Sequence, residues 1–329
     1  MKAIQFGRFG GPEVLEVVDV PAPIPGPGDL VVRVRAAGVN LSDALMRENR
    51  YAVTPALPAI PGNEVVGEVV EVGREVKGFA LGDRVALSLF ASGLSVGGYA
   101  ELVAADPRFA TRIPPELSDE EAVALMVQGL TALALTRHTP VAGKTVLVSA
   151  AAGGVGGLLL QLLRHAGARR IIALASTAEK RELTLGLGAN AAVDYTAPGW
   201  TEEVRSLTNG TGPDVVLESV GGDVTGAALS VLAQRGVMVV YGALNIQRFS
   251  LGVPELLQLI FKNQAVLGFA LVTLLTPETL HSDLDALFQM AQDGRLQTRL
   301  GGRFSLADAA SAHRELESRQ TAGKLILVP

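Results

Sequence analysis

The chain has 329 residues, a formal net charge of −5, four histidines and no cysteine. Its length exceeds the roughly 100 to 200 residues of one domain, so two domains are expected, and the lack of cysteine excludes disulfides, thiolate nucleophiles and cysteine-bound zinc. The sequence has no basic stripe, signal segment or apolar run of membrane length, which argues against nucleic acid as a partner and predicts a soluble, cytoplasmic protein.

The first part of the chain is predicted to be mainly β. Short apolar runs are separated by Gly/Pro turns such as 25–28, and antiparallel pairing in a compact barrel-like domain explains this spacing. This part carries no nucleotide motif. The expected strands are Lys2–Phe6, Leu15–Val20, Asp29–Arg35, Val65–Val72 and Asp83–Leu87.

The middle of the chain alternates short apolar runs with helical patterns, which indicates parallel strands buried on both faces. A Rossmann domain with a doubly wound parallel sheet is therefore predicted. After a first strand beginning at Thr145, the expected strands are 170–175, 191–194, 214–218 and 236–241, and the expected helices are 155–165, 178–187, 201–207 and 225–232.

The turn after the first of these strands is rich in glycine. Gly153, Gly154 and Gly156 lack a Cβ, so the backbone can approach a pyrophosphate and the next helix can point its N–H groups at the phosphates. Ala151 stands where the motif G-x-G-x-x-G has its first glycine. A tight turn without a ligand is the alternative, but the repeated strand–helix context favours a dinucleotide site.

The end of the second parallel strand is where such a domain distinguishes its coenzymes. An acidic residue there would hold the ribose 2′-hydroxyl of NAD. Here Ser176, Lys180 and Tyr195 suit a 2′-phosphate, so NADPH is favoured over NADH. Glu179 is the nearest acid and could offset this preference, and a solvated helix face at Lys180 and Arg181 is the alternative interpretation.

The last part of the chain begins with an apolar stretch, Gln264–Thr273, which is predicted to be the final strand of the parallel sheet. An exposed strand this apolar is an aggregation hazard unless it is paired. The preceding stretch, Leu251–Phe261, has few charges and is a candidate pocket wall or dimer surface. A helix is expected at 284–292. Residues 303–313 are expected to lead into another helix, and residues 324–328 to form a closing strand.

Two smaller expectations concern single side chains. Ser305 and Asp308 form a capping arrangement before the last helix. The histidines do not have metal-ligand spacing, and each is expected at the surface or at a helix end. They are His138, His165, His281 and His313.

Motifs along almost the whole chain resemble one family. They are Pro25–Asp29, Ala37–Asp43, Pro61–Gly67, Gly73, Gly82–Val85, Gly98–Glu101 and Ala150–Gly156. In this order they resemble the medium-chain dehydrogenase/reductase superfamily, and most of all its zinc-free quinone oxidoreductase branch, which includes zeta-crystallin. The resemblance implies a GroES-like, mainly β catalytic domain of residues 1–124 and 276–329 and a Rossmann NADPH-binding domain of residues 125–275.

Two departures from the superfamily pattern concern zinc. Zinc-dependent relatives have a cysteine and a histidine where this chain has Asn40 and Asn63, and the four-cysteine lobe is missing. Without a metal, the readiest hydride acceptor is one that is already electrophilic. We therefore expect a zinc-independent oxidoreductase that reduces a quinone or an α,β-unsaturated carbonyl with NADPH.

The resemblance also implies roles for individual residues. Asn40 is expected to hydrogen-bond the nicotinamide ribose or the substrate oxygen, and Tyr51 is a candidate proton donor, with solvent as the alternative. Asp43 is expected to fix the loop. Leu45, where relatives often have tyrosine, suggests a more apolar pocket floor. The remaining expected coenzyme contacts are Gln128, Thr131, Ala152, Gly153, Gly154, Val155, Gly156, Ser219, Val220, Gly221, Tyr241, Gly242, Ala243 and Lys324.

The family resemblance also implies a homodimer that pairs the 264–273 edge strands across a two-fold axis. Two other functions stay open. One is an enoyl-thioester (enoyl-CoA or enoyl-ACP) reductase, which would need an apolar channel and a basic site for phosphopantetheine. The other is a non-catalytic NADPH-binding or RNA-binding protein.

Overall fold

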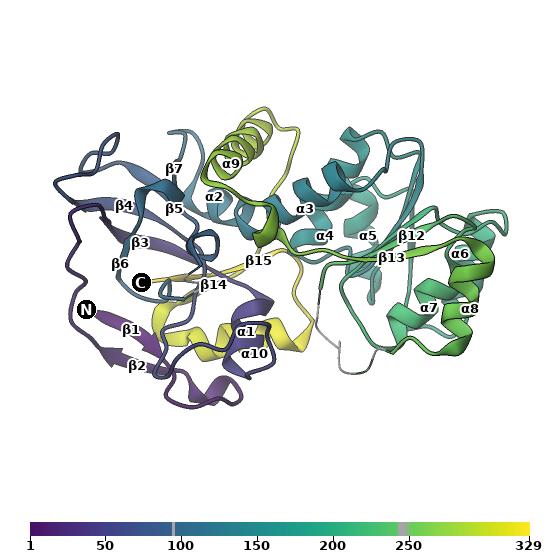
Figure 1. The fold of residues 1–329 in the computed structure, drawn as a ribbon, viewed down its shortest axis with the longest axis horizontal. Helices are drawn as coiled ribbons and strands as arrows, with labels where there is room; N and C mark the ends of the chain where they lie inside the picture. The colour runs from purple at the N-terminus through teal and green to yellow at the C-terminus, as the bar shows by residue number, and fades with distance from the viewer. Residues whose placement is uncertain (94–95, 243–247, 249) are drawn as a thin grey trace. The chain divides into compact units, whose positions relative to one another are not determined.

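The structure is a computed structural model, and it describes residues 1–93, 96–242, 248 and 250–329. These residues form two compact units. Unit 1 consists of Met1–Leu130 and Val272–Pro329, and unit 2 of Thr131–Leu271; Figure 1 shows the course of the chain through both. The boundaries expected from the sequence lie at 124/125 and 275/276. Among the described residues, each helix is too short or too polar to cross a membrane.

Unit 2 is built on a six-stranded parallel sheet in the order β10-β9-β8-β11-β12-β13. The chain enters at the centre, moves outward to β10, and then returns to continue from β11 in the opposite direction. This reversal is the mark of a doubly wound sheet, in which ligands bind outside the carboxyl ends of the strands where the order reverses. The strands are β8 Thr145–Val148, β9 Arg170–Leu174, β10 Ala191–Val193, β11 Val215–Glu218, β12 Val237–Val240 and β13 Ala265–Gly268.

Helices cover both faces of this sheet, because right-handed crossovers change face when the chain changes direction. In Figure 1, α4 and α5 lie on one side of the strands and α6, α7 and α8 on the other. Their bounds are α4 Gly154–His165, α5 Ala178–Gly186, α6 Trp200–Leu207, α7 Asp223–Val231 and α8 Val253–Lys262. Side chains of α6 and α7 pack with those of β8, β9, β11 and β12 in one buried cluster. The predicted Rossmann domain is confirmed.

Unit 1 contains a sheet of order β14-β15-β3-β4-β5-β7, in which β6 also pairs with β3, and a separate β1-β2 pair. All pairs are antiparallel except β14 with β15. The bounds are β1 Lys2–Gln5, β2 Glu16–Asp19, β3 Leu30–Val39, β4 Val65–Val72, β5 Arg84–Leu87, β6 Leu102–Ala105, β7 Ala110–Arg112, β14 Leu300–Ser305 and β15 Lys324–Val328.

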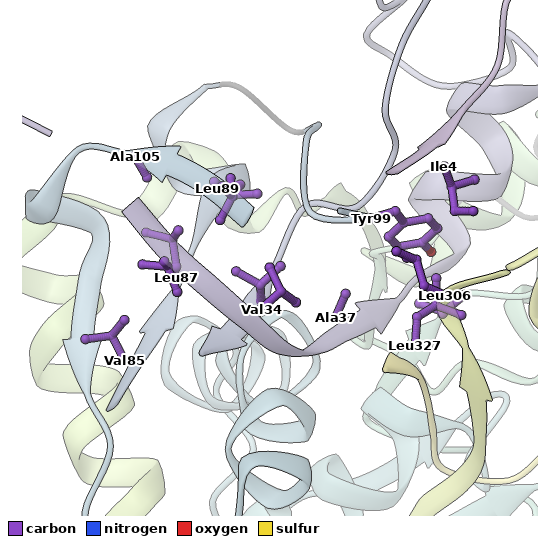
Figure 2. Close-up of a cluster of buried hydrophobic side chains, with 14 of the residues drawn as sticks. Ile4, Val34, Ala37, Val85, Leu87, Leu89, Tyr99, Ala105, Leu306 and Leu327 are labelled. Carbon is purple, nitrogen blue, oxygen red and sulfur yellow. The ribbon is translucent and has the colours of Figure 1, made fainter. Parts of the chain in front are cut away.

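The central strand of unit 1 is β3, whose register against β4 shifts twice, at Val31/Val32 and at Val34/Ala36. Such bulges bend a strand, and here β3 pairs with β4, β6 and β15 in turn. The core in this bend takes side chains from β3, β5, the Tyr99 segment and the C-terminal part of the chain (Figure 2).

The helices of unit 1 are α1 Leu41–Arg47, α2 Asp119–Leu125, α9 Pro277–Gln292 and α10 Ala309–Ser318, with α3 Val127–His138 crossing into unit 2. Helix α9 starts seven residues before the expected 284, at Pro277. The reason is local: Thr276 accepts a hydrogen bond from the Thr279 N–H at 3.2 Å, and proline is favoured at the first helical position.

The expected long strand at 264–273 is shorter in the structure. Only Ala265–Gly268 pairs with β12, and Leu271–Leu274 form a 3-10 turn. The sequence expectation followed apolar character alone, and apolar residues in a 3-10 turn give the same signal. The predicted capping arrangement at Ser305 is not formed: the Ser305 hydroxyl donates to Asp308 at 2.6 Å, but neither side chain accepts a backbone N–H at a helix start.

Candidate active site and coenzyme site

Asn40 lies where β3 ends and α1 begins. Its backbone N–H donates to Asp43 Oδ2 at 2.9 Å in a capping box, so the Asp43 carboxyl fixes the loop as expected. The side chain of Asn40 therefore leaves the end of β3 from a backbone that the cap holds in place.

A buried ion pair lies beside Asn40. Lys324, the first residue of β15, donates from Nζ to Asn40 Oδ1 at 2.8 Å and forms a salt bridge with Glu64. The other oxygen of Glu64 accepts the Val127 N–H at 2.7 Å, at the start of α3. Both charged side chains are 0% exposed. The ammonium expected near a pyrophosphate thus lies in the interior of unit 1, where it joins β15 to the ends of β3 and β4.

The amide of Asn40 is fully used as a donor. Its Nδ2 donates to Asn63 Oδ1 at 2.9 Å and to Glu64 Oε1 at 2.8 Å. Because the Lys324 ammonium can only donate, Oδ1 must face it, and this fixes the orientation of the amide. Asn40 keeps a free lone pair on Oδ1 but no N–H, so in this arrangement it can accept from a ribose hydroxyl and cannot donate to a substrate oxygen.

A second buried network follows from Asp43. The Tyr99 hydroxyl lies 3.4 Å from Asp43 Oδ2 and 3.2 Å from His313 Nε2, and His313 Nδ1 lies 2.9 Å from Arg47 Nη1. Arginine only donates, so Nδ1 accepts and the neutral ring carries its proton on Nε2. The expectation of a surface position was wrong for His313, which is buried on α10. Nothing beside it in the sequence indicates the buried arginine that it binds.

These groups have strongly altered proton affinities. Burial raises the pKa of Asp43 to about 7, more than the Asn40 N–H and the charge of Lys324 lower it. Burial, with the charge of Arg47, lowers the pKa of His313 to about 3. Tyr99, between them, has a pKa well above its ordinary value because it is buried.

Tyr51 lies in the loop after α1 and is 40% exposed. Partial burial and the nearby charge of Asp43 raise the pKa of its phenol. The phenol is therefore protonated at neutral pH, as a proton donor must be. Leu45, in contrast, is buried in α1.

The glycine turn of unit 2 has a strained start. Ala150 has φ +46°, a conformation that costs a residue with a Cβ about 1 kcal/mol or more. Helix α4 then begins at Gly154 with Gly153 as its N-cap and no side-chain cap. A Cβ on Gly156 would lie 2.5 Å from Ala150 O. The turn is thus packed against the helix start, and the first N–H groups of α4 have no capping side chain and can receive an anion.

Replacing Gly156 with alanine is expected to destabilise the protein by about 1–3 kcal/mol, since the new methyl would meet backbone atoms that cannot move away. Gly157→Ala is the matched control, because its Cβ would lie 3.2 Å from the flexible end of Leu187. Alanine also favours the helix at both positions. Denaturant unfolding of both variants measures the difference, and equal stabilities would contradict this packing argument.

The end of β11 uses its own backbone donors. Glu218 Oε1 accepts the N–H groups of Val220 at 2.6 Å and Gly221 at 2.8 Å, and the Ser219 N–H donates to Ser149 Oγ at 2.9 Å. The three residues expected to contact the coenzyme here therefore have their N–H groups engaged inside unit 2. Burial raises the pKa of Glu218.

The end of β12 comes close to Ser219. A Cβ on Gly242 would lie 2.6 Å from Ser219 Cβ, so only glycine permits this approach. Burial raises the pKa of the neighbouring Tyr241 to about 12, which keeps its hydroxyl protonated. The expected contact at Ala243 lies outside the described residues.

The side chains expected to read the 2′-position lie around the start of α5. Thr177 caps this helix by accepting the Lys180 N–H at 3.2 Å, and partial burial lowers the pKa of the Lys180 ammonium. Arg181 instead forms a salt bridge with Asp194 at 2.8 Å. Ser176 and Tyr195 are half-buried. Lys180 is thus partly desolvated, unlike a residue on a fully solvated helix face.

The remaining expected residues lie on α3. Gln128 is half-buried and belongs to unit 1, while Thr131 is buried and begins unit 2. Gly129 allows close packing, since a Cβ there would lie 3.2 Å from Leu287 of α9.

Comparison with known proteins shows what these two units resemble. Residues 26–115 match the alcohol dehydrogenase GroES-like domain and residues 154–290 the zinc-binding dehydrogenase domain. A quinone oxidoreductase of Pseudomonas aeruginosa is 37% identical over 100% of this chain and 99% of its own length. The chain belongs to the quinone oxidoreductase family of the medium-chain dehydrogenase/reductase superfamily.

Two further members of this superfamily are similar over the full chain. The crystal structure of Escherichia coli quinone oxidoreductase, solved in complex with NADPH, covers 100% of both chains with a TM-score of 0.92 at 31% identity. A 2-haloacrylate reductase of Burkholderia is 32% identical over 98% of this chain and 97% of its own length. The predicted family and fold are confirmed, and the chain is an oxidoreductase.

One of the matching domains is named for zinc, but the side chains of this quinone oxidoreductase family member do not fit that metal. Asn40 and Asn63 offer amides in place of thiolate and imidazole. The Lys324 ammonium already lies against Asn40 and Glu64, so a second cation there would meet a fixed positive charge. Across the described residues, there is no group of three or more His, Cys, Asp or Glu that could hold a metal.

The side chains that bind the expected residues were not predicted from the sequence. Glu64 follows Asn63 in the Pro61–Gly67 motif, and an acid directly before the apolar strand β4 is a detectable signal for a buried charge. Lys324, at the head of an apolar strand, is the corresponding signal of opposite sign. Glu218, at the end of the apolar strand β11, is a third such signal, whereas His313 gave none, because it stands in a helix between Ala312 and Arg314.

Proposed function

We propose that the protein is a zinc-independent reductase that transfers a hydride from NADPH to a quinone or to an α,β-unsaturated carbonyl. The observation that carries this proposal is the cluster of Asn40, Asn63, Glu64 and Lys324, in which two amides stand at the positions of the zinc ligands and the carboxylate is paired with an ammonium. With no Lewis acid to polarise a simple ketone, the acceptor must already be electrophilic. The 2-haloacrylate reductase supports the second acceptor class, since an acrylate is an α,β-unsaturated carboxylate.

The residues of unit 2 fit a dinucleotide. The uncapped start of α4 and the glycine turn from Ala152 to Gly156 would hold the pyrophosphate, and Ser176, Lys180 and Tyr195 the 2′-phosphate. When bound, NADPH supplies a hydride, which carries two electrons. Asn40 would accept from the nicotinamide ribose, and the proton for the reduced acceptor would come from Tyr51 or from solvent.

The test is the oxidation of NADPH, followed by absorbance, with a panel of benzoquinone, naphthoquinone, short enones, aldehydes and enoyl-CoA. We expect turnover with quinones or enones and little with aldehydes. Preference for enoyl-CoA would instead indicate an enoyl-thioester reductase. Binding of NADPH without turnover on any acceptor would contradict the proposal and favour a non-catalytic NADPH-binding protein.

The choice of coenzyme gives a separate prediction. Lys180→Ala is expected to raise the KM for NADPH about tenfold and to leave the KM for NADH unchanged, because only NADPH carries the phosphate that the ammonium would contact. Arg181→Ala is the control, since Arg181 pairs with Asp194. If the wild-type enzyme prefers NADH, or if Lys180→Ala affects both coenzymes equally, the assignment of NADPH is wrong.

We also propose that the protein is a homodimer through the edge of unit 2. In the described part of the sheet, β13 is the last strand and Leu267 on it is 51% exposed. On the neighbouring α8, Ile260 is 66% and Phe261 77% exposed. Apolar side chains this exposed mark an interface. Light scattering is expected to give twice the mass of 34.2 kDa, and a Phe261→Asp variant should shift towards monomer. A monomer mass for the wild type at all concentrations would contradict the dimer.

A further inference from the structure

We propose that the hydroxyl of Ser42 donates a hydrogen bond to the carbonyl oxygen of the acceptor and stabilises the negative charge that forms there. This inference rests on the proposed function and names a catalytic residue for it. It follows from the direction of the hydrogen bonds in the buried cluster of unit 1, which leads from Lys324 to Ser42.

Three hydrogen bonds of the cluster run in one direction, from Lys324 to Ser42, while others branch to Glu64. Lys324 Nζ donates to Asn40 Oδ1 at 2.8 Å, Asn40 Nδ2 donates to Asn63 Oδ1 at 2.9 Å, and Asn63 Nδ2 donates to Ser42 Oγ at 2.9 Å. An ammonium has no lone pair, so it fixes the first amide, which fixes the second. Ser42 Oγ therefore accepts the last of these three hydrogen bonds, and its own hydroxyl proton points away from Asn63.

Among these four hydrogen-bonded residues, Ser42 is the one that a ligand can reach. Asn40 is 6% exposed, Asn63 4% and Lys324 0%, whereas Ser42 is half-buried. Its hydroxyl accepts the bond from Asn63 and, within the residues that the structure describes, donates none. Since both N–H groups of Asn40 are engaged, the Ser42 hydroxyl replaces the Asn40 amide as the donor to a substrate oxygen.

The cluster prepares this donor electrostatically. A hydroxyl that accepts a hydrogen bond becomes a better donor, and successive bonds in a buried chain polarise one another. The charge of Lys324 is balanced by Glu64, so the cluster adds no net charge. The effect of the cluster is to fix the position of the Ser42 oxygen and the direction of its O–H dipole. Donors fixed before the reaction are those that contribute most to oxyanion stabilisation.

The chemical step balances without a proton from Ser42. The acceptor carbon forms a new C–H bond with the hydride, the C4–H bond of the dihydronicotinamide breaks, and the displaced π electrons move onto the carbonyl oxygen. The coenzyme is oxidised and the acceptor becomes an enolate, which in the case of a quinone then tautomerises to the hydroquinone monoanion. Ser42 keeps its proton while it stabilises this oxyanion, and the donor named above supplies the proton that completes the product.

The test compares Ser42→Ala with Ser42→Thr in the full-length protein. We expect kcat with the best acceptor to fall roughly 10²-fold in Ser42→Ala, while the KM for NADPH stays unchanged. In Ser42→Thr, which keeps the hydroxyl, kcat should stay within about threefold of wild type. Ser305→Ala, which removes a hydroxyl that donates to Asp308, is the control and should retain full activity.

A binding measurement separates stabilisation of the oxyanion from a loss of structure. 4-Nitrophenol bound to the NADP⁺ complex reports its ionisation by its visible absorbance. Wild type and Ser42→Thr should bind the phenolate in preference to the phenol, and Ser42→Ala should lose this preference by a similar factor while keeping its melting temperature.

Two failures are distinguishable. A wild-type enzyme that reduces no acceptor in the panel would contradict the proposed function, and with it the role of Ser42. An active wild type with equal kcat and equal phenolate preference in Ser42→Ala would overturn the role of Ser42 alone.

Discussion

Replacing Lys324 with methionine is expected to destabilise the protein by about 3–5 kcal/mol, the usual cost of breaking a buried ion pair by removing one partner. The substitution leaves the carboxylate of Glu64 uncompensated in a site where both residues are 0% exposed. It also removes the donor that orients Asn40. Denaturant unfolding at pH 7 measures the loss, which is a large fraction of the stability of a typical domain.

A double variant distinguishes the buried charge from the packing of the side chain. Lys324→Met combined with Glu64→Gln removes both charges, and Gln keeps an oxygen to accept the Val127 N–H. We expect this double variant to recover much of the lost stability, because replacing both partners of a buried pair costs far less than breaking it. If the double variant is as unstable as Lys324→Met, packing at β15 is the cause and the electrostatic explanation is wrong.

The sequence predicted the two domain types well because each depends on local periodicity. Alternating apolar runs and helical patterns gave most strands and helices of unit 2 to within a few residues, although β13 is shorter than expected, and Gly153 and Gly156 located the glycine turn at the start of α4. Helix α8 was noticed only as a stretch of few charges.

The partners within the candidate site could not be predicted in the same way. Asn40 and Lys324 are 284 residues apart, and their contact arises from the pairing of β3 with β15. Nothing in the neighbourhood of either residue encodes that register. The resemblance identified Asn40, but the number of its free hydrogen-bond donors depends on Asn63, Glu64 and Lys324 together, and only the folded structure brings these side chains into contact.

The second large effect concerns pH. Asp43 and His313 are expected to make opposite and nearly cancelling contributions to the stability of the protein between about pH 4 and pH 6.5. Burial raises the pKa of Asp43 from its ordinary value to about 7, so over this range the folded state holds a proton that the unfolded state has lost. Its contribution to stability therefore falls as pH rises.

His313 behaves in the opposite sense. Burial and the charge of Arg47 lower its pKa to about 3, so between about pH 3 and its ordinary pKa of about 6.5 the unfolded state holds a proton that the folded state lacks. Its contribution to stability rises with pH. Tyr99 bridges the two groups, and together they are a neutral acid and a neutral base over this range. Among the described residues Asp43 Oδ1 has no hydrogen-bond partner, so we expect the proton of the neutral acid on this oxygen.

Removing one group should expose the pH dependence of the other. Relative to wild type, Asp43→Asn is expected to gain about 3 kcal/mol of stability as pH rises from 4 to 6.5, and His313→Gln to lose about as much. The difference from wild type cancels the titration of the other carboxylates. The groups that face the pair, Arg47, Glu64 and Lys324 among them, are unchanged in both variants.

Asp106→Asn provides the control. Arg108 lowers the pKa of the Asp106 carboxyl, so removing this carboxyl should change the pH dependence of stability only slightly and in one direction. Urea unfolding at half-unit pH steps measures all three differences. Parallel curves for wild type and Asp43→Asn would mean that Asp43 ionises normally in the folded state. Water would then have to solvate its carboxylate inside unit 1, and the neutral pair across Tyr99 could not exist.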